Sequence, residues 1–156
     1  MIFATVGSHP TYRFERFLNA LEALPEGELV VQHGPGEPPA NATEAAPWMT
    51  FAEIVDHMER AEHVVSHAGA GTILCAARAG QIPIVFPRLQ RFEETVDDHQ
   101  LELARRLAED GRVVVVESSA ELAAGVATAA PRGAASPVDA GADLIAAVRG
   151  AILADG

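Results

Sequence analysis

The most informative part of the chain is the segment His63-Val64-Val65-Ser66-His67-Ala68-Gly69-Ala70-Gly71-Thr72, an apolar run that leads directly into a turn with two glycines. Its β-branched residues predict a buried strand from His63 to Ser66. A helix is expected from the glycine turn to about Ala79, because Gly80 is typical of a helix C-terminal cap. A strand, a turn and a helix in this order form the unit from which parallel α/β sheets are built.

The same alternation of strand and helix patterns recurs on both sides of this segment. Further strands are expected at Ile2–Val6, Glu28–His33, Trp48–Thr50, Ile82–Phe86 and Arg112–Val116. Helices are expected at Tyr12–Leu24, Phe51–Ala61, Thr95–Glu109, after Ser118 or Ser119, and at Asp139–Leu153. Irregular loops are expected at Gly34–Pro47 and Pro131–Pro137, which are rich in glycine and proline. The pattern predicts an α/β fold, a single Rossmann-like doubly wound parallel sheet in one domain over residues 1–156.

Composition limits the compartment and the ligands. The 156 residues carry a formal net charge of −11, which repels nucleic acids and anionic membranes, so no nucleic-acid partner is expected. No apolar run reaches the roughly 20 residues of a membrane span, and the first residues do not resemble a signal peptide. The single cysteine, Cys75, excludes an internal disulfide and fits a reducing compartment. We therefore expect a cytoplasmic protein, and the absence of a cysteine pair or a His-Glu-x-x-His pattern argues against a metal site.

Two polar turns are predicted to meet at one edge of the sheet. In the strand order 3-2-1-4-5-6 the first and fourth strands are neighbours, and ligands bind beyond their carboxyl ends. Those ends are Gly7-Ser8-His9 and His67–Thr72. The glycines and the helix start of the second turn suit a phosphate, although packing alone explains a tight glycine turn equally well. For the first turn, the alternative is that Ser8 or Thr11 caps the first helix.

Two further segments carry side chains that suit a nucleotide or a sugar. Asp98, His99 and Gln100 offer the mixture of donors and acceptors that sugar hydroxyls need. The simpler interpretation is an acidic helix start, from Glu93 onward, that complements the helix dipole. Trp48-Met49-Thr50-Phe51 either cradles a flat base near the switch point or packs into the core.

Four segments, taken in order, resemble the C-terminal domain of glycosyltransferase family 28. They are Thr5–His9, Ser66–Leu74, Ile82–Arg88 and Val96–Leu101, and the likeness extends from Met1 to about Val116. It is greatest to the short stand-alone members, the soluble donor-binding subunits of two-chain N-acetylglucosaminyltransferases and of bacterial exopolysaccharide glycosyltransferases. The resemblance implies the C-terminal half of a GT-B fold, a UDP-sugar as donor substrate, and no metal or other cofactor.

The resemblance also implies a role for each segment. The donor diphosphate would meet Gly7, Ser8, His67, Gly69, Ala70, Gly71 and Thr72. The uracil would lie near Met49, Thr50 and Phe51, and the donor sugar near Asp98, His99 and Gln100. His9 is the candidate catalytic residue, as a base or as a hydrogen-bond donor. Related enzymes bind the ribose hydroxyls with a glutamate where this chain has Cys75, and a thiol cannot replace a carboxylate that accepts two hydrogen bonds.

These features predict a hexosyltransferase of polysaccharide biosynthesis that transfers sugar from a UDP-sugar to a lipid-linked acceptor. Because the length matches one half of a GT-B enzyme, we expect a separate membrane-associated acceptor-binding chain, which would recruit the protein to the inner face of the membrane. The helix at 139–153 either docks on that partner, through Leu144, Ile145, Val148 and Ile152, or packs on its own domain. A homodimer is also open. The alternatives are a non-catalytic nucleotide-binding or regulatory module, which Cys75 favours, and an epimerase-like enzyme, which the length disfavours.

Overall fold

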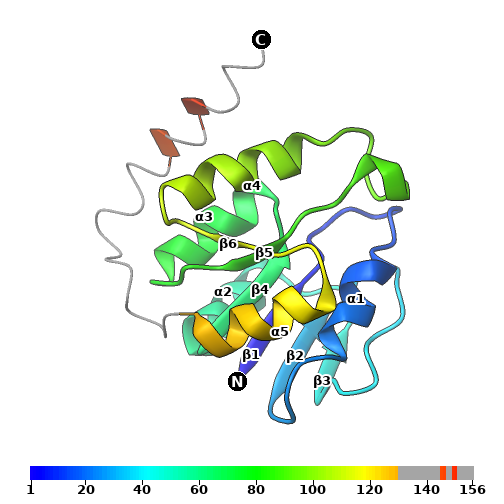
Figure 1. Ribbon diagram of the computed structural model, residues 1–156. Coiled ribbons are helices and arrows are strands. Elements are labelled where there is room, and N and C mark those ends of the chain that lie inside the picture. Colours follow the sequence, from blue (N-terminus) through cyan, green and yellow to red (C-terminus); the bar gives the residue numbers. More distant parts are fainter. Residues whose placement is uncertain (130–144, 147–148, 151–156) are drawn as a thin grey trace.

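The computed structural model describes residues 1–129, 145–146 and 149–150, in which a six-stranded sheet lies between two layers of helices (Figure 1). The strands are β1 (Ile2–Thr5), β2 (Leu29–Gln32), β3 (Glu44–Ala46), β4 (His63–His67), β5 (Ile84–Phe86) and β6 (Val114–Val115). Every neighbouring pair is parallel, and the order across the sheet is β3-β2-β1-β4-β5-β6. The predicted doubly wound α/β sheet, with β1 beside β4 at the switch point, is confirmed.

Helices cover both faces of this sheet. They are α1 (Glu15–Leu21), α2 (Phe51–Arg60), α3 (Ala70–Arg78), α4 (His99–Glu109) and α5 (Ser119–Thr128), with a short 3-10 helix, η1, at Gln90–Phe92. α1 and α5 lie on one face, and α2, α3 and α4 lie on the other (Figure 1). The strands β1, β2, β4 and β5 are largely apolar and buried because a parallel sheet of this kind is covered on both sides.

Successive residues of each central strand contribute to different halves of the core. Ala4 and Val65 pack in the core beneath α1 and α5, whereas their neighbours Phe3 and Val64 pack beneath α2 and α3. All four are essentially inaccessible to solvent, and the division follows the period of two of an extended strand. Because β1 and β4 are held from both faces, the turns at their carboxyl ends have fixed positions.

The third strand lies at Glu44–Ala46, so the prediction of a strand at Trp48–Thr50 and of an irregular loop throughout Gly34–Pro47 is wrong. β3 pairs with β2 at the edge of the sheet and exposes the side chains of Glu44 and Ala45. An exposed edge strand lacks the apolar pattern by which buried strands are recognised. Thr50 instead begins α2 in a capping box, in which its hydroxyl accepts from Glu53 N and the Glu53 carboxylate accepts from Thr50 N.

Two helices begin later than predicted. α1 begins at Glu15 and not at Tyr12, because the residues before it form a turn around the His9 ring. α4 begins at His99 and not at Thr95, because Glu93 adopts the left-handed conformation with φ of 56° and ends η1 there. The predicted helix at 139–153 lies outside the described residues, apart from 145–146 and 149–150.

Candidate functional site

The turns that follow β1 and β4 lie side by side, with Thr5 opposite Ser66 in the sheet register. Gly7 has φ of 83°, a conformation that side-chain-bearing residues rarely adopt. The imidazole of His67, the last residue of β4, packs against the α-carbons of Gly7 and Gly69, so that a methyl group at either position would overlap the ring. Packing against His67 therefore explains the glycine at both positions.

Packing does not explain Gly71. A Cβ atom at this position would meet nothing within 4 Å, although the residue lies in the first turn of α3. The N-cap of α3 is Gly69, which has no side chain to accept from the first amides of the helix. The N–H groups of Ala70, Gly71 and Thr72 are thus available to an anion at the positive end of the helix dipole. An open approach for a ligand accounts for the glycine at 71.

A cavity of about 350 Å³ lies on the β2 side of this edge, and we call it the β2-side cavity. Its walls come from the ends of β1 and β2, from the segment before α2, and from the exposed face of α3. They include the predicted base-binding residues Met49 and Phe51, the predicted diphosphate-binding residues Gly71 and Thr72, and Cys75. Burial raises the pKa of the Cys75 thiol, which is thus a neutral group at this wall. The remaining lining residues are Thr5, Gly7, Ser8, Gln32, Trp48 and Ile54.

A second cavity, of about 440 Å³, lies on the β5 side, and we call it the β5-side cavity. It shares Ser8 with the β2-side cavity, so the two meet at the β1 turn. Among its lining residues, His9, His67 and Gln100 are predicted site residues. The others are Val6, Pro10, Tyr12, Arg88, Glu94, Thr95 and Val96. The arrangement offers a ligand two adjoining chambers on either side of Ser8.

His9 uses one ring nitrogen to hold its own turn. Its Nδ1 lies 3.4 Å from Thr11 N and 3.3 Å from Tyr12 N, and both amides donate to it. Because Nδ1 accepts, the neutral ring carries its proton on Nε2. The exposed Nε2–H is then a hydrogen-bond donor, so the geometry favours the donor role over the base role that the sequence left open.

His67 is neutral at physiological pH. Removal from water, followed by the positive charge of Arg88, lowers the pKa of His67 to about 4. The neutral imidazole lines the β5-side cavity and needs no counter-charge when the site is free.

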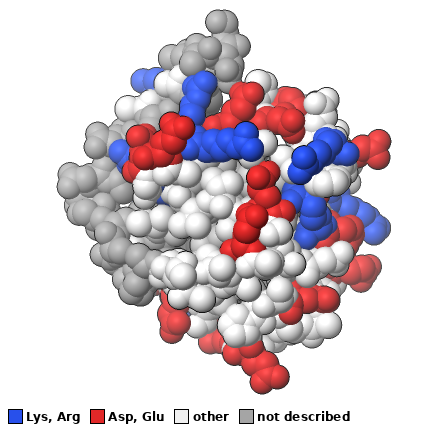
Figure 2. Space-filling model, viewed as in Figure 1, with Lys and Arg blue, Asp and Glu red and all other residues white. Residues whose placement is uncertain are grey.

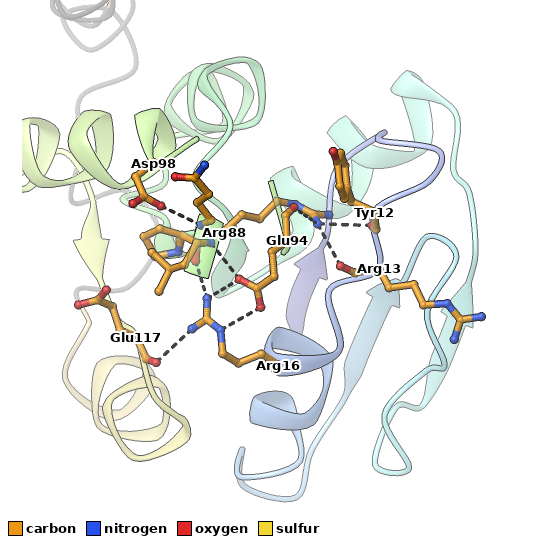
Figure 3. A network of polar contacts seen from close by, with 10 residues as sticks. Tyr12, Arg13, Arg16, Arg88, Glu94, Asp98 and Glu117 are labelled. Atoms are coloured by element: carbon orange, nitrogen blue, oxygen red, sulfur yellow. Dashed lines mark hydrogen bonds and ion pairs between the residues drawn. The ribbon is translucent and has the colours of Figure 1, made fainter. Parts of the chain in front are cut away.

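The three predicted sugar-binding residues fall in different environments. Gln100 lines the β5-side cavity, and its Oε1 is buried with no hydrogen-bond partner among the described residues. The Asp98 carboxylate accepts from Gln90 N at 2.8 Å (Figure 3). His99 is exposed and lies between Asp97 and Glu102, with ring nitrogens 3.6 and 3.8 Å from their carboxylates. Of the three, Gln100 is the one that the structure brings together with His9 and His67.

The sequence matches a known protein family. Residues 1–135 match the sequence model of the glycosyltransferase family 28 C-terminal domain. The chain belongs to this family. Over 55 residues it is 38% identical to the UDP-N-acetylglucosamine transferase subunit ALG13 of Yarrowia lipolytica (strain CLIB 122 / E 150), a match that covers 35% of this chain and 26% of that protein.

Solved structures share the fold of this family 28 domain. The glycotransferase of kitacinnamycin superposes with a TM-score of 0.60 at 23% identity, covering 99% of this chain and 42% of that one. The calicheamicin glycosyltransferase CalG4 superposes with a TM-score of 0.57 at 21% identity, and the match covers 99% of this chain and 41% of that one. The chain thus spans about two fifths of each of these proteins, and its fold is that of the C-terminal half of a GT-B glycosyltransferase.

Two buried networks in this family 28 domain were not predicted. On the β5 side, Arg88 contacts four backbone carbonyls, and Glu94 forms a two-bond pair with Arg16 at 2.8 and 3.0 Å (Figure 3). The expectation that Glu94 lies at an acidic helix start is therefore wrong, because Glu94 is 5% exposed and precedes α4 by several residues. An arginine two residues after a buried apolar strand is the one sequence signal that pointed here.

On the β2 side, the buried side chain of Gln32 performs a similar task. Its Nε2 donates to Gly7 O at 3.2 Å and to Pro47 O at 2.9 Å, and its Oε1 accepts from the Thr5 hydroxyl. Gln32 therefore ties the β1 turn to the segment that carries Trp48 and Met49. The sequence signal for this network was Gln32 itself, a polar residue within an otherwise apolar strand.

The surface charge of the family 28 domain is mixed. On the face drawn in Figure 2, arginine side chains are interspersed with aspartate and glutamate. Nucleic-acid-binding proteins instead present a continuous basic surface to phosphates.

Within residues 1–129, 145–146 and 149–150, no group of three or more His, Cys, Asp or Glu residues is placed to hold a metal ion. No helix in that part of the chain is both long and apolar enough to cross a membrane.

Proposed function

We propose that this chain binds a UDP-sugar and contributes the donor half of a glycosyltransferase that moves a hexose-type sugar to an acceptor hydroxyl. The observation that carries the proposal is the pair of cavities that meet at Ser8 beside the first turn of α3. A nucleotide diphosphate sugar has three parts in a row, and the two adjoining cavities could hold its two ends, with the start of α3 in the wall of the β2-side cavity to meet the diphosphate. Membership of family 28 and the likeness to a UDP-N-acetylglucosamine transferase subunit support the assignment.

The nucleoside would occupy the β2-side cavity. Trp48 and Phe51 are large apolar side chains that remain 48% and 69% exposed, and both line this cavity together with Met49. Flat apolar groups of this kind suit the face of a uracil ring. The ribose would then lie toward Cys75, where the family commonly has a glutamate.

The diphosphate would lie over the start of α3. The free amides of Ala70, Gly71 and Thr72 would bind its oxygens, with Gly7, Ser8, His67 and Gly69 around them. The same donors would stabilise the negative charge that develops on the departing UDP, which is the largest contribution that such a site makes to catalysis. In this proposal the helix start neutralises the diphosphate, and no metal or other cofactor is used.

The sugar would enter the β5-side cavity. The unpaired Oε1 of Gln100 suits a sugar hydroxyl. Asp98 and His99 would contribute from the rim, Asp98 by fixing the backbone at Gln90. His9 would lie nearest the anomeric carbon and donate its Nε2–H to the sugar or to the diphosphate.

In the reaction, the oxygen of the acceptor hydroxyl would attack the anomeric carbon while the bond from that carbon to the UDP oxygen breaks. The acceptor proton would pass to a base. Because His9 Nδ1 already accepts from two backbone amides, the base would come from the other half of the enzyme. That half would be a separate membrane-associated chain that binds a lipid-linked acceptor at the cytoplasmic face of the membrane, in polysaccharide biosynthesis. The predicted helix at 139–153 is a candidate for docking on it, and the alternative is that this helix packs on its own domain. Homodimerisation is also open.

A transfer assay tests this function. The purified chain is incubated with a radiolabelled UDP-sugar and lipid-linked acceptor, alone and together with the co-expressed acceptor-binding chain. We expect product with both chains and little with this chain alone. Efficient transfer by this chain alone would contradict the partner requirement. UDP binding without transfer in any combination would favour the second candidate, a non-catalytic nucleotide-binding or regulatory module, which the thiol at Cys75 makes plausible.

A further inference from the structure

Arg88 lines the β5-side cavity two residues after the end of β5, and 3% of its surface is exposed. Its Nη2 donates to Val6 O at 3.1 Å, and its Nη1 lies 3.2–3.4 Å from the carbonyl oxygens of Tyr12, Arg13 and Glu94. One side chain therefore joins both ends of the β1 turn to the segment that leads into α4 (Figure 3).

That segment, residues 89–98, is itself anchored by Glu94. The Glu94 carboxylate accepts from Leu89 N at 2.9 Å, which closes the segment into a loop, and from Arg16 at 2.8 and 3.0 Å. Arg16 in turn donates to Pro87 O and Glu117 O. Arg88 and Glu94 thus tie this segment to the rest of the domain, while the Asp98 carboxylate holds it locally by accepting from Gln90 N.

The two parts that Arg88 joins are the two walls of the β5-side cavity. One wall is the β1 turn with His9, and the other is the segment that carries Val96 and leads to Gln100. The β2-side cavity is fixed differently, through the Gln32 bonds to Gly7 O and Pro47 O. Each cavity therefore has its own buried side chain that sets the distance between its walls.

We propose that Arg88 is a positioning residue for the donor sugar, which sets the geometry of the β5-side cavity and governs sugar recognition while leaving nucleotide binding to the Gln32 side. The inference rests on the proposed function. The guanidinium suits this task because it presents five N–H donors in a rigid plane, and its Cζ lies 4.5 Å from the centre of the Phe14 ring, which fixes that plane. A lysine keeps the charge but cannot reach four carbonyls from one plane.

The test compares Arg88→Lys and Arg88→Gln with the wild type by calorimetric titration with UDP, UDP-glucose, UDP-N-acetylglucosamine and UDP-glucuronic acid. Arg60→Gln is the matched control, because Arg60 is exposed and forms an ion pair with Asp56 within its own helix, away from both cavities. We expect UDP affinity to stay within about twofold, and the affinity of the preferred UDP-sugar relative to UDP to fall about tenfold, the equivalent of one or two hydrogen bonds. The differences in affinity among the three UDP-sugars should become smaller as well. Arg88→Lys carries the test if Arg88→Gln does not fold.

Hydrogen exchange without ligand provides the second readout. In Arg88→Lys, amides in 8–13 and 89–98 should exchange faster, and amides in 47–54 should not. In a Gln32→Ala variant, amides in 47–54 should exchange faster and amides in 89–98 should not. This variant should also lose affinity for UDP itself. Equal losses of UDP and UDP-sugar affinity in Arg88→Lys, or no loss of either, would overturn the inference and leave the proposed function standing. A wild-type chain that binds no UDP, whatever its exchange pattern, would overturn both.

Discussion

The imidazole of His67, at the end of β4, fills the space that a side chain at Gly7, at the end of β1, would need. The same ring excludes a side chain at Gly69, whereas a Cβ atom at Gly71 would meet nothing within 4 Å. The glycines of this site therefore have two separate causes. Gly7 and Gly69 allow the two turns to pack on His67, and Gly71 leaves the approach to the start of α3 open.

This division predicts opposite effects of substitution at the two glycines of the second turn. Gly71→Leu should reduce UDP affinity more than tenfold while leaving the free energy of unfolding unchanged or raised by up to about 1 kcal/mol, because glycine is a poor helix residue. Gly69→Ala should lower the free energy of unfolding by roughly 1–3 kcal/mol, because the added methyl group overlaps the His67 ring. Calorimetry and urea denaturation measure the two effects. Gly27→Leu, in an open loop before β2, is the control that should change neither.

The neutral His67 predicts a pH dependence of stability. Its folded pKa of about 4 lies below the ordinary value of 6.5, so the unfolded chain binds more protons between these values and stability is lost as pH falls through this window. The loss from this group alone should reach about 2 kcal/mol at pH 5. Urea denaturation from pH 7.5 to 5 measures it, and His67→Asn should flatten the curve by that amount. Parallel curves for the two proteins would show that His67 titrates normally.

Replacing the thiol of Cys75 with a carboxylate should strengthen UDP binding. Cys75→Glu should raise UDP affinity about tenfold, because a carboxylate at this wall of the β2-side cavity can accept hydrogen bonds from both ribose hydroxyls. The gain should vanish with 2′-deoxy-UDP, and Cys75→Ser should show none of it. An equal gain for both nucleotides would mean that the new carboxylate does not contact the ribose.

The hydrogen bonds of His9 lead us to expect different activities for His9→Asn and His9→Gln. Asn can replace the Nδ1 acceptor that holds the turn, whereas Gln can place an N–H donor near the position of Nε2. In the two-chain assay, His9→Ala and His9→Asn should therefore lower kcat about 10- to 100-fold with little change in donor binding, and His9→Gln should retain more activity. An unchanged kcat in His9→Ala would remove His9 from the mechanism.

The sheet order and the two adjoining turns were predictable from the sequence because they depend on local patterns. Apolar runs give the buried strands, and the carboxyl ends of β1 and β4 must then meet. β3 was missed because Glu44 and Ala45 lie at an exposed edge, where burial imposes no pattern. Arg88 and Gln32 were missed because their partners are distant in sequence, such as Val6 for Arg88 and Gly7 for Gln32. Glu94 was misassigned because an acidic residue near a helix start looks the same whether it serves the dipole or a buried arginine.

In our proposal, the start of α3 and the β2-side cavity form a uridine diphosphate site. Calorimetric titration of the purified chain with UDP, with ADP and GDP as controls, tests it most directly. The proposal predicts selective binding of UDP that is lost in Gly71→Leu and kept in Gly27→Leu. Equal affinity for all three nucleotides, or UDP binding that survives in Gly71→Leu, would contradict it.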